Sequence, residues 1–243
     1  MLQRLCCLMI LVICFFPTFS QRSEQLWLDF QLSYPFANRY LLENTASYQT
    51  LLSKEGKWRN LSISPVFEYV LINWIDLLSE IPIGYTNQTD GVSSFEIMPM
   101  VGARFYITQG KRIDMRFVLR YQVRAFRQIE DDDWDYSNRT RVRGEMFLCI
   151  NGPNLFTDNL WYGFLDYEEF LVLDQQLDER FANRRRARIG LAYRLNYKHR
   201  FELSYTRQTS RNEIEGDFTS GDNVIQAKYK MFLNPAKPVR VDE

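Results

Sequence analysis

The sequence is poor in the residues that build disulfides, metal sites and acid–base catalysts. It contains four cysteines and one histidine among 243 residues, and Cys6, Cys7 and Cys14 all lie in the first 20 residues. Without that segment Cys149 has no partner for an internal disulfide, and no Cys/His spacing typical of a zinc site remains. We therefore predict no metal, no cofactor and no internal disulfide.

A bias of charge and long apolar runs are also missing. Lys plus Arg and Asp plus Glu each number 30, so the chain lacks the basic excess that sequence-independent binding to nucleic acid requires. After residue 20 no run of about 18 apolar residues occurs, which argues against a transmembrane helix. The composition therefore predicts no nucleic-acid partner and no helical membrane anchor.

The first 20 residues have the features of a secretory signal peptide. Arg4 precedes an apolar run from Leu5 to Phe16, and the segment ends at Ser20. Such a segment is removed on export, and Ile13 before Cys14 disfavours lipid attachment because that position requires a small residue. We predict a signal peptide at 1–20 and one exported domain at 21–243, in which 234–243 forms a flexible tail.

The rest of the chain alternates apolar and charged residues with the two-residue period of a β-strand. Arg112, Arg116, Arg120 and Arg124 share one face of a predicted strand, and apolar residues occupy the other face. In a soluble sandwich the apolar face packs against a second sheet. In an outer-membrane barrel it contacts lipid, and the charged face lines the interior. Aromatic residues make up 15% of the chain, which suits the aromatic girdles of such barrels.

Strand length and loop length favour the barrel. Eleven segments read as strands, and no segment has a convincing helical period: 25–34, 38–52, 57–70, 74–85, 93–108, 111–128, 136–150, 160–174, 182–197, 199–210 and 222–233. Several exceed the roughly 9–11 residues that cross a membrane. Connections near 73–74, 109–110 and 197–198 are short, whereas those near 86–92, 129–137 and 209–221 are long and polar. This alternation predicts an all-β fold, a single antiparallel transmembrane barrel of about 10–12 strands with short periplasmic turns and longer extracellular loops. Because bacterial barrels usually have an even number of strands, we expect ten or twelve.

The alternation also predicts which charged side chains line the lumen. The candidates are Arg104, Arg112, Arg116, Arg120, Arg124, Arg139, Arg141, Arg143, Arg184, Arg186, Arg188, Glu43, Asp76, Glu80, Glu96, Asp166 and Glu168. They predict an interior with an arginine side and a carboxylate side. One interpretation is an ion-pair network that fills a narrow lumen and fixes the register of the strands. The other interpretations are a charged constriction that selects solutes and a binding site for an anionic lipid or sugar acid.

Catalytic residues are scarce. A barrel hydrolase needs a His base beside a Ser nucleophile, but the residue two positions after His199 is Phe201, which has no hydroxyl. The acidic run from Glu130 to Asp135 lacks the spaced ligands and the turn glycine of an EF-hand, so a solvated external loop is the simpler interpretation. We predict no catalytic residues and no enzymatic activity.

The order of features from Leu165 onward resembles that of a known family. An acidic strand, Asp166-Tyr-Glu-Glu-Phe170, is followed by the arginine-rich strand 183–195 and by Phe201-Glu-Leu-Ser-Tyr205. Together with the Trp27-Leu-Asp-Phe30 strand, this order resembles an uncharacterised Bacteroidetes-type outer-membrane family, the domain of unknown function 2490. The resemblance spans nearly the whole exported chain. It implies an outer-membrane barrel but no reaction or substrate.

Together these observations predict a porin-like protein of the bacterial outer membrane, with a structural role or a role in passive solute transport. The alternatives are a barrel hydrolase that acts on lipid and a soluble secreted β-sandwich or ligand-binding protein. The expected partners are outer-membrane lipid and lipopolysaccharide, the barrel-assembly machinery and a small solute.

Overall fold

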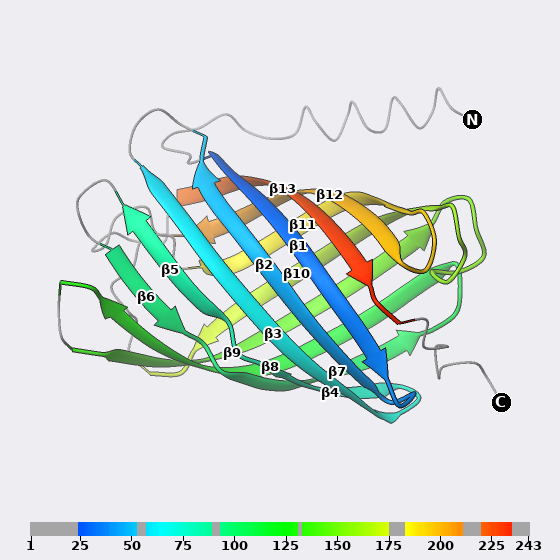
Figure 1. Cartoon of the computed structure of the whole chain (residues 1–243), viewed down its shortest axis with the longest axis horizontal. Coiled ribbons are helices and arrows are strands. Elements are labelled where there is room, and N and C mark those ends of the chain that lie inside the picture. The colour runs from blue at the N-terminus through cyan, green and yellow to red at the C-terminus, as the bar shows by residue number, and fades with distance from the viewer. Residues whose placement is uncertain are drawn as a thin grey trace.

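The computed structural model describes residues 24–52, 57–88, 93–130, 133–174, 183–210 and 220–234. The predicted signal peptide, and the predicted tail after Asn234, lie outside these residues. The described part consists of thirteen β-strands joined by turns and loops: β1 (Glu24–Phe36), β2 (Tyr40–Leu51), β3 (Trp58–Ile72), β4 (Ile75–Glu80), β5 (Ile83–Gln88), β6 (Ser93–Ile97), β7 (Met100–Thr108), β8 (Ile113–Gln128), β9 (Asp135–Cys149), β10 (Leu160–Val172), β11 (Asn183–Arg194), β12 (His199–Ser210) and β13 (Ser220–Phe232). Strongly tilted strands cross the molecule from end to end (Figure 1).

Two pairs of these strands each form one interrupted strand of the wall. β4 and β5 both pair with β3, and the interruption between them contains Pro82. β6 and β7 both pair with β8, and the interruption between them contains Pro99. Proline has no N–H to donate to a sheet ladder, which explains why regular pairing stops there. The wall therefore has eleven strand positions, and these correspond to the eleven segments predicted from the sequence.

The ring closes between β1 and β13, which pair in parallel from Glu24 with Asn223 to Ser33 with Phe232. All other neighbouring strands are antiparallel. The predicted all-β barrel is confirmed, but the expectation of an even number of strands is wrong. The ten antiparallel steps from the first to the eleventh strand position leave the last strand in the same direction as the first, so only a parallel pair can close the ring.

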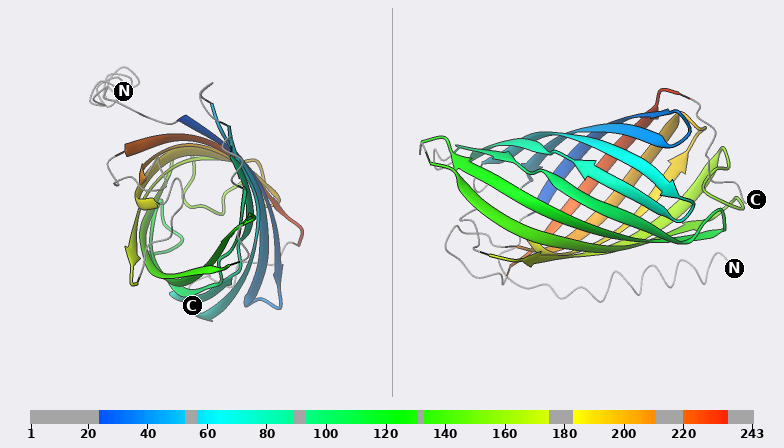
Figure 2. Two further views of the ribbon diagram at one scale, coloured as in Figure 1. Left: turned by 90° about the vertical axis from the view of Figure 1, so that its left-hand side faces the viewer. Right: turned by 90° about the horizontal axis from the view of Figure 1, so that it is seen from below.

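The barrel has two different rims. The connections 37–39, 73–74, 109–112 and 195–198 gather at one end, which we call the short-turn rim, together with the ten-residue connection 150–159. That longer connection is ordered by Asn151, whose side chain donates to the Asn159 carbonyl at 2.9 Å and accepts from the Trp161 N–H at 2.7 Å. The ends of β2, β5, β8, β10 and β12 lie at the other end, which we call the long-loop rim because the sequence predicts longer connections there. Viewed along its axis, the barrel is a closed ring flattened on the side of β1 to β3 (Figure 2).

The distribution of polarity is reversed relative to a water-soluble domain. Among the described residues, twenty of the buried side chains are polar or charged and twelve are hydrophobic, whereas the outer face exposes large apolar side chains on every wall strand. Buried polar groups are tolerated only where they are paired, and an exposed apolar belt requires a lipid environment. No helix in the part of the chain that the structure describes is long and apolar enough to cross a bilayer.

Apolar residues do not always point outward, and the largest group of inward ones lies on β10. Leu160, Tyr162 and Phe164 of β10 are buried inside the barrel near the short-turn rim, where they pack with Cys149 and Ala192. They lie on the inward face because residues of one parity share a face, and Asp166 and Glu168 belong to the same parity. The lumen near the short-turn rim is therefore partly filled by hydrophobic side chains.

Candidate functional site

The centre of the lumen is occupied by a group of ion pairs around Glu168, which we call the Glu168 cluster: Glu80, Arg120, Arg141, Glu168 and Arg186. The side chain of Glu168 is only 1% exposed, and its Oε1 lies 3.2 Å from Arg120 Nη2 and 2.9 Å from Arg141 Nη2. Arg186 Nη1 lies 3.9 Å from Glu168 Oε2. A buried carboxylate is costly unless it is paired, and here three strands each supply a guanidinium.

Arg120 links the two carboxylates of this cluster, which lie on different strands of the wall. Its Nη1 lies 3.1 Å from Glu80 Oε2 on β4, whereas its Nη2 contacts Glu168 on β10. Gly102 on β7 makes this geometry available, because a Cβ atom there would lie 2.7 Å from Arg120 Cγ and 2.2 Å from the Leu119 carbonyl oxygen. The absent side chain at Gly102 therefore leaves room for the arginine stem to lie along the wall.

Arg186 crosses the lumen from β11. Its guanidinium carbon lies 5.2 Å from the ring centre of Trp27 on β1 and 5.6 Å from that of Phe170 on β10. Arg139 and Arg141 approach the same Phe170 ring at 5.0 Å and 4.8 Å. Stacked guanidinium groups retain their hydrogen-bonding edges while the aromatic faces are covered. The Arg186 side chain therefore spans the part of the interior between β11 and β1 and narrows the lumen at this level.

A second chain of polar contacts lies on the short-turn side of the Glu168 cluster. We call the cluster and this chain together the interior belt. Asp166 Oδ2 accepts a hydrogen bond from Arg188 Nε at 2.7 Å, and Arg188 Nη1 donates to Gln226 Oε1 at 3.4 Å. Gln226 Nε2 donates to Asp29 Oδ2 at 2.6 Å, and Ser47 Oγ donates to Asp29 Oδ1 at 2.7 Å. These five residues link β10, β11, β13, β1 and β2. The interior is therefore tied together around most of the ring.

The interior belt separates two polar cavities. One cavity of about 490 Å³ lies toward the short-turn rim and is lined by Glu68, Arg104, Glu145 and Arg188 among others. The other, of about 290 Å³, lies toward the long-loop rim and includes Trp27, Glu80 and Arg186 in its lining. Glu168 and Arg120 line neither cavity, because they lie between the two.

Most of the other sequence-predicted lumen residues also point inward and are paired. Arg104 contacts Glu68 at 2.6 Å and Asp76 at 3.8 Å, Arg116 contacts Asp114 at 2.7 Å, and Arg143 contacts Glu145 at 2.7 Å. Arg124 pairs with Glu96, Arg139 donates to Gln122 at 2.8 Å, and Glu43 accepts from Gln31 at 2.6 Å and from Ser33 at 2.7 Å. The arginines concentrate on β7 to β11, and Glu43, Glu68, Asp76 and Glu80 lie on β2 to β4.

Two of the predicted lumen residues need separate treatment. Arg112 precedes β8 and is exposed at the short-turn rim, where it donates to the carbonyls of Cys149 at 3.1 Å and Ile150 at 3.2 Å. Its assignment to the lumen is therefore wrong, because the strand begins only after it. The side chain of Arg184 lies outside the described part of the structure.

Sequence reasoning missed the aromatic and amide residues in and around the interior belt. Trp27, Phe170 and Gln226 are inward and hold Arg186, Arg188 and Asp29 in place. The signal that could have found Phe170 and Gln226 is parity, because each lies an even number of residues from a charged inward residue on its own strand. The lumen residues predicted from the sequence are all charged, so these three are left out.

The lone histidine does not have a serine partner in the geometry that the structure describes. His199 Nδ1 lies 2.8 Å from the hydroxyl of Tyr229, and the two rings stack with centres 6.0 Å apart. Ser204 lies on the inward face and is buried, with its hydroxyl 3.4 Å from Gln226 Oε1. Among the described residues, which omit Asp131 and Asp132 of the acidic loop, no group of three or more His, Cys, Asp and Glu side chains is arranged to hold a metal ion.

Comparison with known proteins agrees with this architecture. The model of the DUF2490 family, described as protein of unknown function, matches residues 24–218, so the chain belongs to that family. No curated protein matches the sequence at a significant level. The structure is similar to that of LpxR from Salmonella typhimurium, with a TM-score of 0.53 and 13% sequence identity over 84% of this chain and 87% of LpxR. At this identity the likeness shows a shared outer-membrane barrel fold.

Proposed function

We propose that this protein is a barrel of the bacterial outer membrane whose lumen is closed in the resting state and whose interior has a structural role. The observation that carries the proposal is the Glu168 cluster, in which Arg120 links β4 to β10 and Arg186 extends from β11 to Trp27 on β1. A closed lumen of this kind leaves the lipid-facing wall and the long-loop rim as the surfaces available to partners. The protein then acts as a membrane-embedded binding scaffold and not as an enzyme.

Passive transport is the second candidate, and the two polar cavities favour it. Each contains charged side chains of both signs, and opposed charges across a narrow passage discriminate between solutes by charge. Transport requires the Glu168 cluster to open, since it lies between the cavities. The two candidates therefore differ in whether ions pass the cluster.

A lipid hydrolase that uses His199 is less well supported. The ring is engaged by the phenol of Tyr229 on the outer face at the short-turn rim, and a phenol is not the Ser nucleophile that the mechanism needs. Loss of a lipid-cleaving activity in His199→Ala would restore this alternative.

Planar-bilayer recording tests the proposal. The mature chain is refolded in detergent, its barrel is confirmed by heat-modifiable mobility on a gel, and its conductance is then measured. We expect the wild-type protein to give no steady open steps, and steady charge-selective steps would support transport instead. Removal of two lumen-crossing side chains in Arg120→Ala/Arg186→Ala should produce conductance. Arg185→Ala, which removes an exposed arginine on the outer face of β11, is the control and should remain silent.

Fractionation tests the membrane location at the same time. We expect the protein in the outer-membrane fraction and soluble only in detergent, since its outer face is apolar. Recovery in the soluble periplasmic fraction would support a secreted soluble protein.

A further inference from the structure

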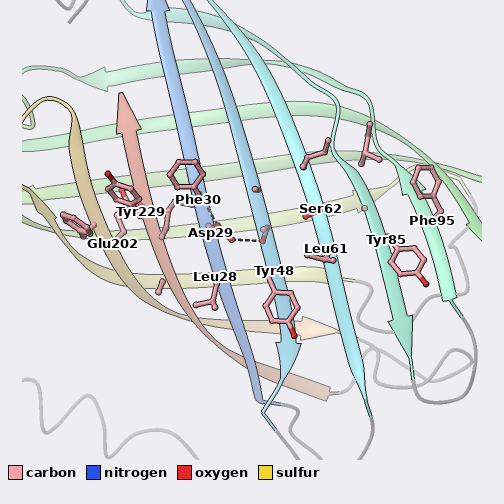
Figure 3. Close-up of a pocket in the computed structure, with 18 residues that line it drawn as sticks. Leu28, Asp29, Phe30, Tyr48, Leu61, Ser62, Tyr85, Phe95, Glu202 and Tyr229 are labelled. Carbon is pink, nitrogen blue, oxygen red and sulfur yellow. Dashed lines mark hydrogen bonds and ion pairs between the residues drawn. The ribbon is translucent and has the colours of Figure 1, made fainter. Parts of the chain in front are cut away.

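The flattened wall carries an apolar hollow on its outer face. This hollow, of about 740 Å³, is lined by residues of β12, β13, β1, β2, β3, β5 and β6. Figure 3 shows the labelled aromatic and leucine side chains Leu28, Phe30, Tyr48, Leu61 and Tyr85 on neighbouring strands along it. They are outward residues of the lipid-facing surface, so the hollow lies against the membrane and is separate from the lumen.

Two rows of paired residues define its shape. One row runs in register from Ala227 through Leu28, Tyr48, Leu61 and Tyr85 to Phe95. The other runs from Tyr229 through Phe30, Ala46 and Ile63 to Ile83. An alanine lies in each row, at Ala227 and at Ala46, between large neighbours. The small side chains form the floor, and the larger residues form the walls.

A hollow of this composition inside the membrane takes hydrocarbon, because a polar occupant would lose its hydrogen bonds there. The rows cross from β13 to β6, which are five strand spacings or roughly 24 Å apart. This width exceeds what the two chains of a phospholipid need side by side. It suits a lipid that carries several acyl chains on one headgroup.

The next row toward the long-loop rim is polar over β2 to β6, whereas its continuation on β1 and β13 is apolar, at Leu26 and Ile225. It contains Thr50, Arg59, Asn87 and Ser93 in register, and Asn87 Nδ2 donates to Ser93 Oγ at 3.1 Å. Arg59 lies on the same face as Leu61, two residues nearer the rim, and is exposed. Over β2 to β6 the hollow is therefore capped by hydrogen-bonding groups on the side of the long-loop rim.

A second arginine lies at the same end. Arg127 of β8 is paired in register with Phe95, and its guanidinium carbon lies 5.5 Å from the ring centre of Trp134. Its Nε is buried and makes no hydrogen bond within the described structure. Arg59 and Arg127 are three strand positions apart, which is roughly 14 Å across the strands, and Arg127 lies in the row of Leu61, one row farther from the long-loop rim than Arg59. No carboxylate of the described residues forms an ion pair with either. Two separated guanidinium groups suit a headgroup with two phosphates.

We propose that the hollow is a binding site for lipopolysaccharide, with its acyl chains over Ala46 and Ala227 and its phosphates at Arg59 and Arg127. The proposal commits to this lipid because the two arginines lie at the long-loop rim, and the long loops of such barrels face the cell exterior, where the outer leaflet is made of lipopolysaccharide. It does not depend on whether the lumen conducts, so its test is independent of the bilayer recording.

Lipid retention tests the site. The full mature chain is refolded in detergent and incubated with purified lipopolysaccharide or with phosphatidylglycerol, and bound lipid is then counted by native mass spectrometry. We expect the wild type to retain lipopolysaccharide in preference to phosphatidylglycerol. Ala46→Trp, which fills the floor, should reduce this retention by about tenfold, since inserted bulk excludes the acyl chains. Ala187→Trp, an exposed outward alanine on β11 away from the hollow, is the matched control and should bind as the wild type does.

The arginines are tested separately. Arg59→Gln/Arg127→Gln should weaken lipopolysaccharide binding by about tenfold or more, since hydrogen bonds to charged groups are lost, and should leave phosphatidylglycerol unchanged. Heat-modifiable mobility confirms that each variant is folded, and Ala227→Trp replaces Ala46→Trp if that variant does not fold. Equal retention of the two lipids by the wild type, or undiminished lipopolysaccharide binding in a folded Trp variant, would overturn the proposal.

Discussion

In one half of the barrel, from β8 to β12, each strand runs without interruption for 12 to 16 residues, and we call it the uninterrupted half. The other half contains β4 to β7, which are segments of five to nine residues, and we call it the interrupted half. Pro65, Pro82 and Pro99 lie at successive positions across the interrupted half. Their carbonyls accept hydrogen bonds from the N–H groups of Ile81 at 3.1 Å, Met98 at 2.8 Å and Val123 at 3.0 Å. The prolines accept but cannot donate, so the ladder of this half lacks bonds that the other half has.

The interior charges compensate for this difference. In the uninterrupted half, neighbouring strands match oppositely charged residues in register, such as Asp166 with Arg188. The interrupted half is instead held from the neighbouring strand β8, whose arginines contact a carboxylate near each interruption: Arg120 contacts Glu80 and Arg124 contacts Glu96. Arginine therefore fixes the register of neighbouring strands in the uninterrupted half and holds the separate segments in place in the interrupted half.

Removal of the central carboxylate, Glu168, should have the largest effect on stability. Glu168→Gln leaves Arg120, Arg141 and Arg186 without their shared partner, and the loss of one member of a buried charge group costs about 3–5 kcal/mol. We expect a large drop in the denaturant or temperature midpoint at which the heat-modifiable band is lost.

The matched control is the adjacent residue on the opposite face. Glu169 pairs with Arg185, whose side chain is 65% exposed, so Glu169→Gln should cost only about 0.2–1 kcal/mol. Equal effects of the two substitutions would contradict a structural role for the Glu168 cluster.

The position of Arg120 depends on the glycine beside it. Gly102→Val places a side chain into the Arg120 stem and the Leu119 carbonyl, and overpacking of this kind costs about 1–3 kcal/mol. Gly144→Val is the control, since a Cβ there meets no atom within 4 Å. We expect the urea midpoint of refolded protein to fall for the first variant and to stay unchanged for the second.

The rate of amide hydrogen exchange should differ between the interrupted and the uninterrupted half. Backbone amides of β4 to β7 should take up deuterium faster than those of β10, because fewer ladder bonds close the interrupted half. Glu80→Gln should accelerate exchange around Ile81 by roughly tenfold, as the loss of one charge-assisted hydrogen bond of about 1.5 kcal/mol implies. Mass spectrometry of peptides from the detergent-solubilised protein measures both rates, and equal rates in the wild type would remove the distinction.

The smallest expected effect concerns the long-loop end of the uninterrupted half. The carboxylate of Asp174 accepts hydrogen bonds from the backbone N–H of Asn138 at 2.9 Å and from its side chain at 2.7 Å, which lowers the pKa of Asp174 from its ordinary value of 3.8. A group with a lowered pKa in the folded state stabilises above its unfolded pKa and loses that contribution as the pH falls through the folded value. Asp174→Asn should therefore be slightly less stable than the wild type at neutral pH, and the difference should vanish below the folded pKa. Urea midpoints at pH 7 and at successively lower pH check this, and a difference that does not shrink as the pH falls would contradict it.

The alternation along β8 and β11 is enough to predict an inward charged face, since side chains of one parity share a side of the sheet. It predicts the inward positions of Arg120, Arg141 and Arg186 but not which carboxylate each contacts. Those pairings depend on the stagger between strands that are far apart in the sequence. Glu80 and Arg120 come together only because the ring places β4 two wall positions from β8.

The sequence alone determined the class of the protein, because two-residue periodicity, strand length and alternating loop length are local properties. It also located the eleven segments that form the wall, although an even number of strands was expected. Only the tertiary structure decided that the ring closes through a parallel pair, that Arg186 reaches Trp27 across the lumen, and that a hollow floored by Ala46 and Ala227 lies on the outer wall. These features depend on closure and stagger of the sheet, and closure brings residues from both ends of the chain side by side at a register that no local pattern encodes.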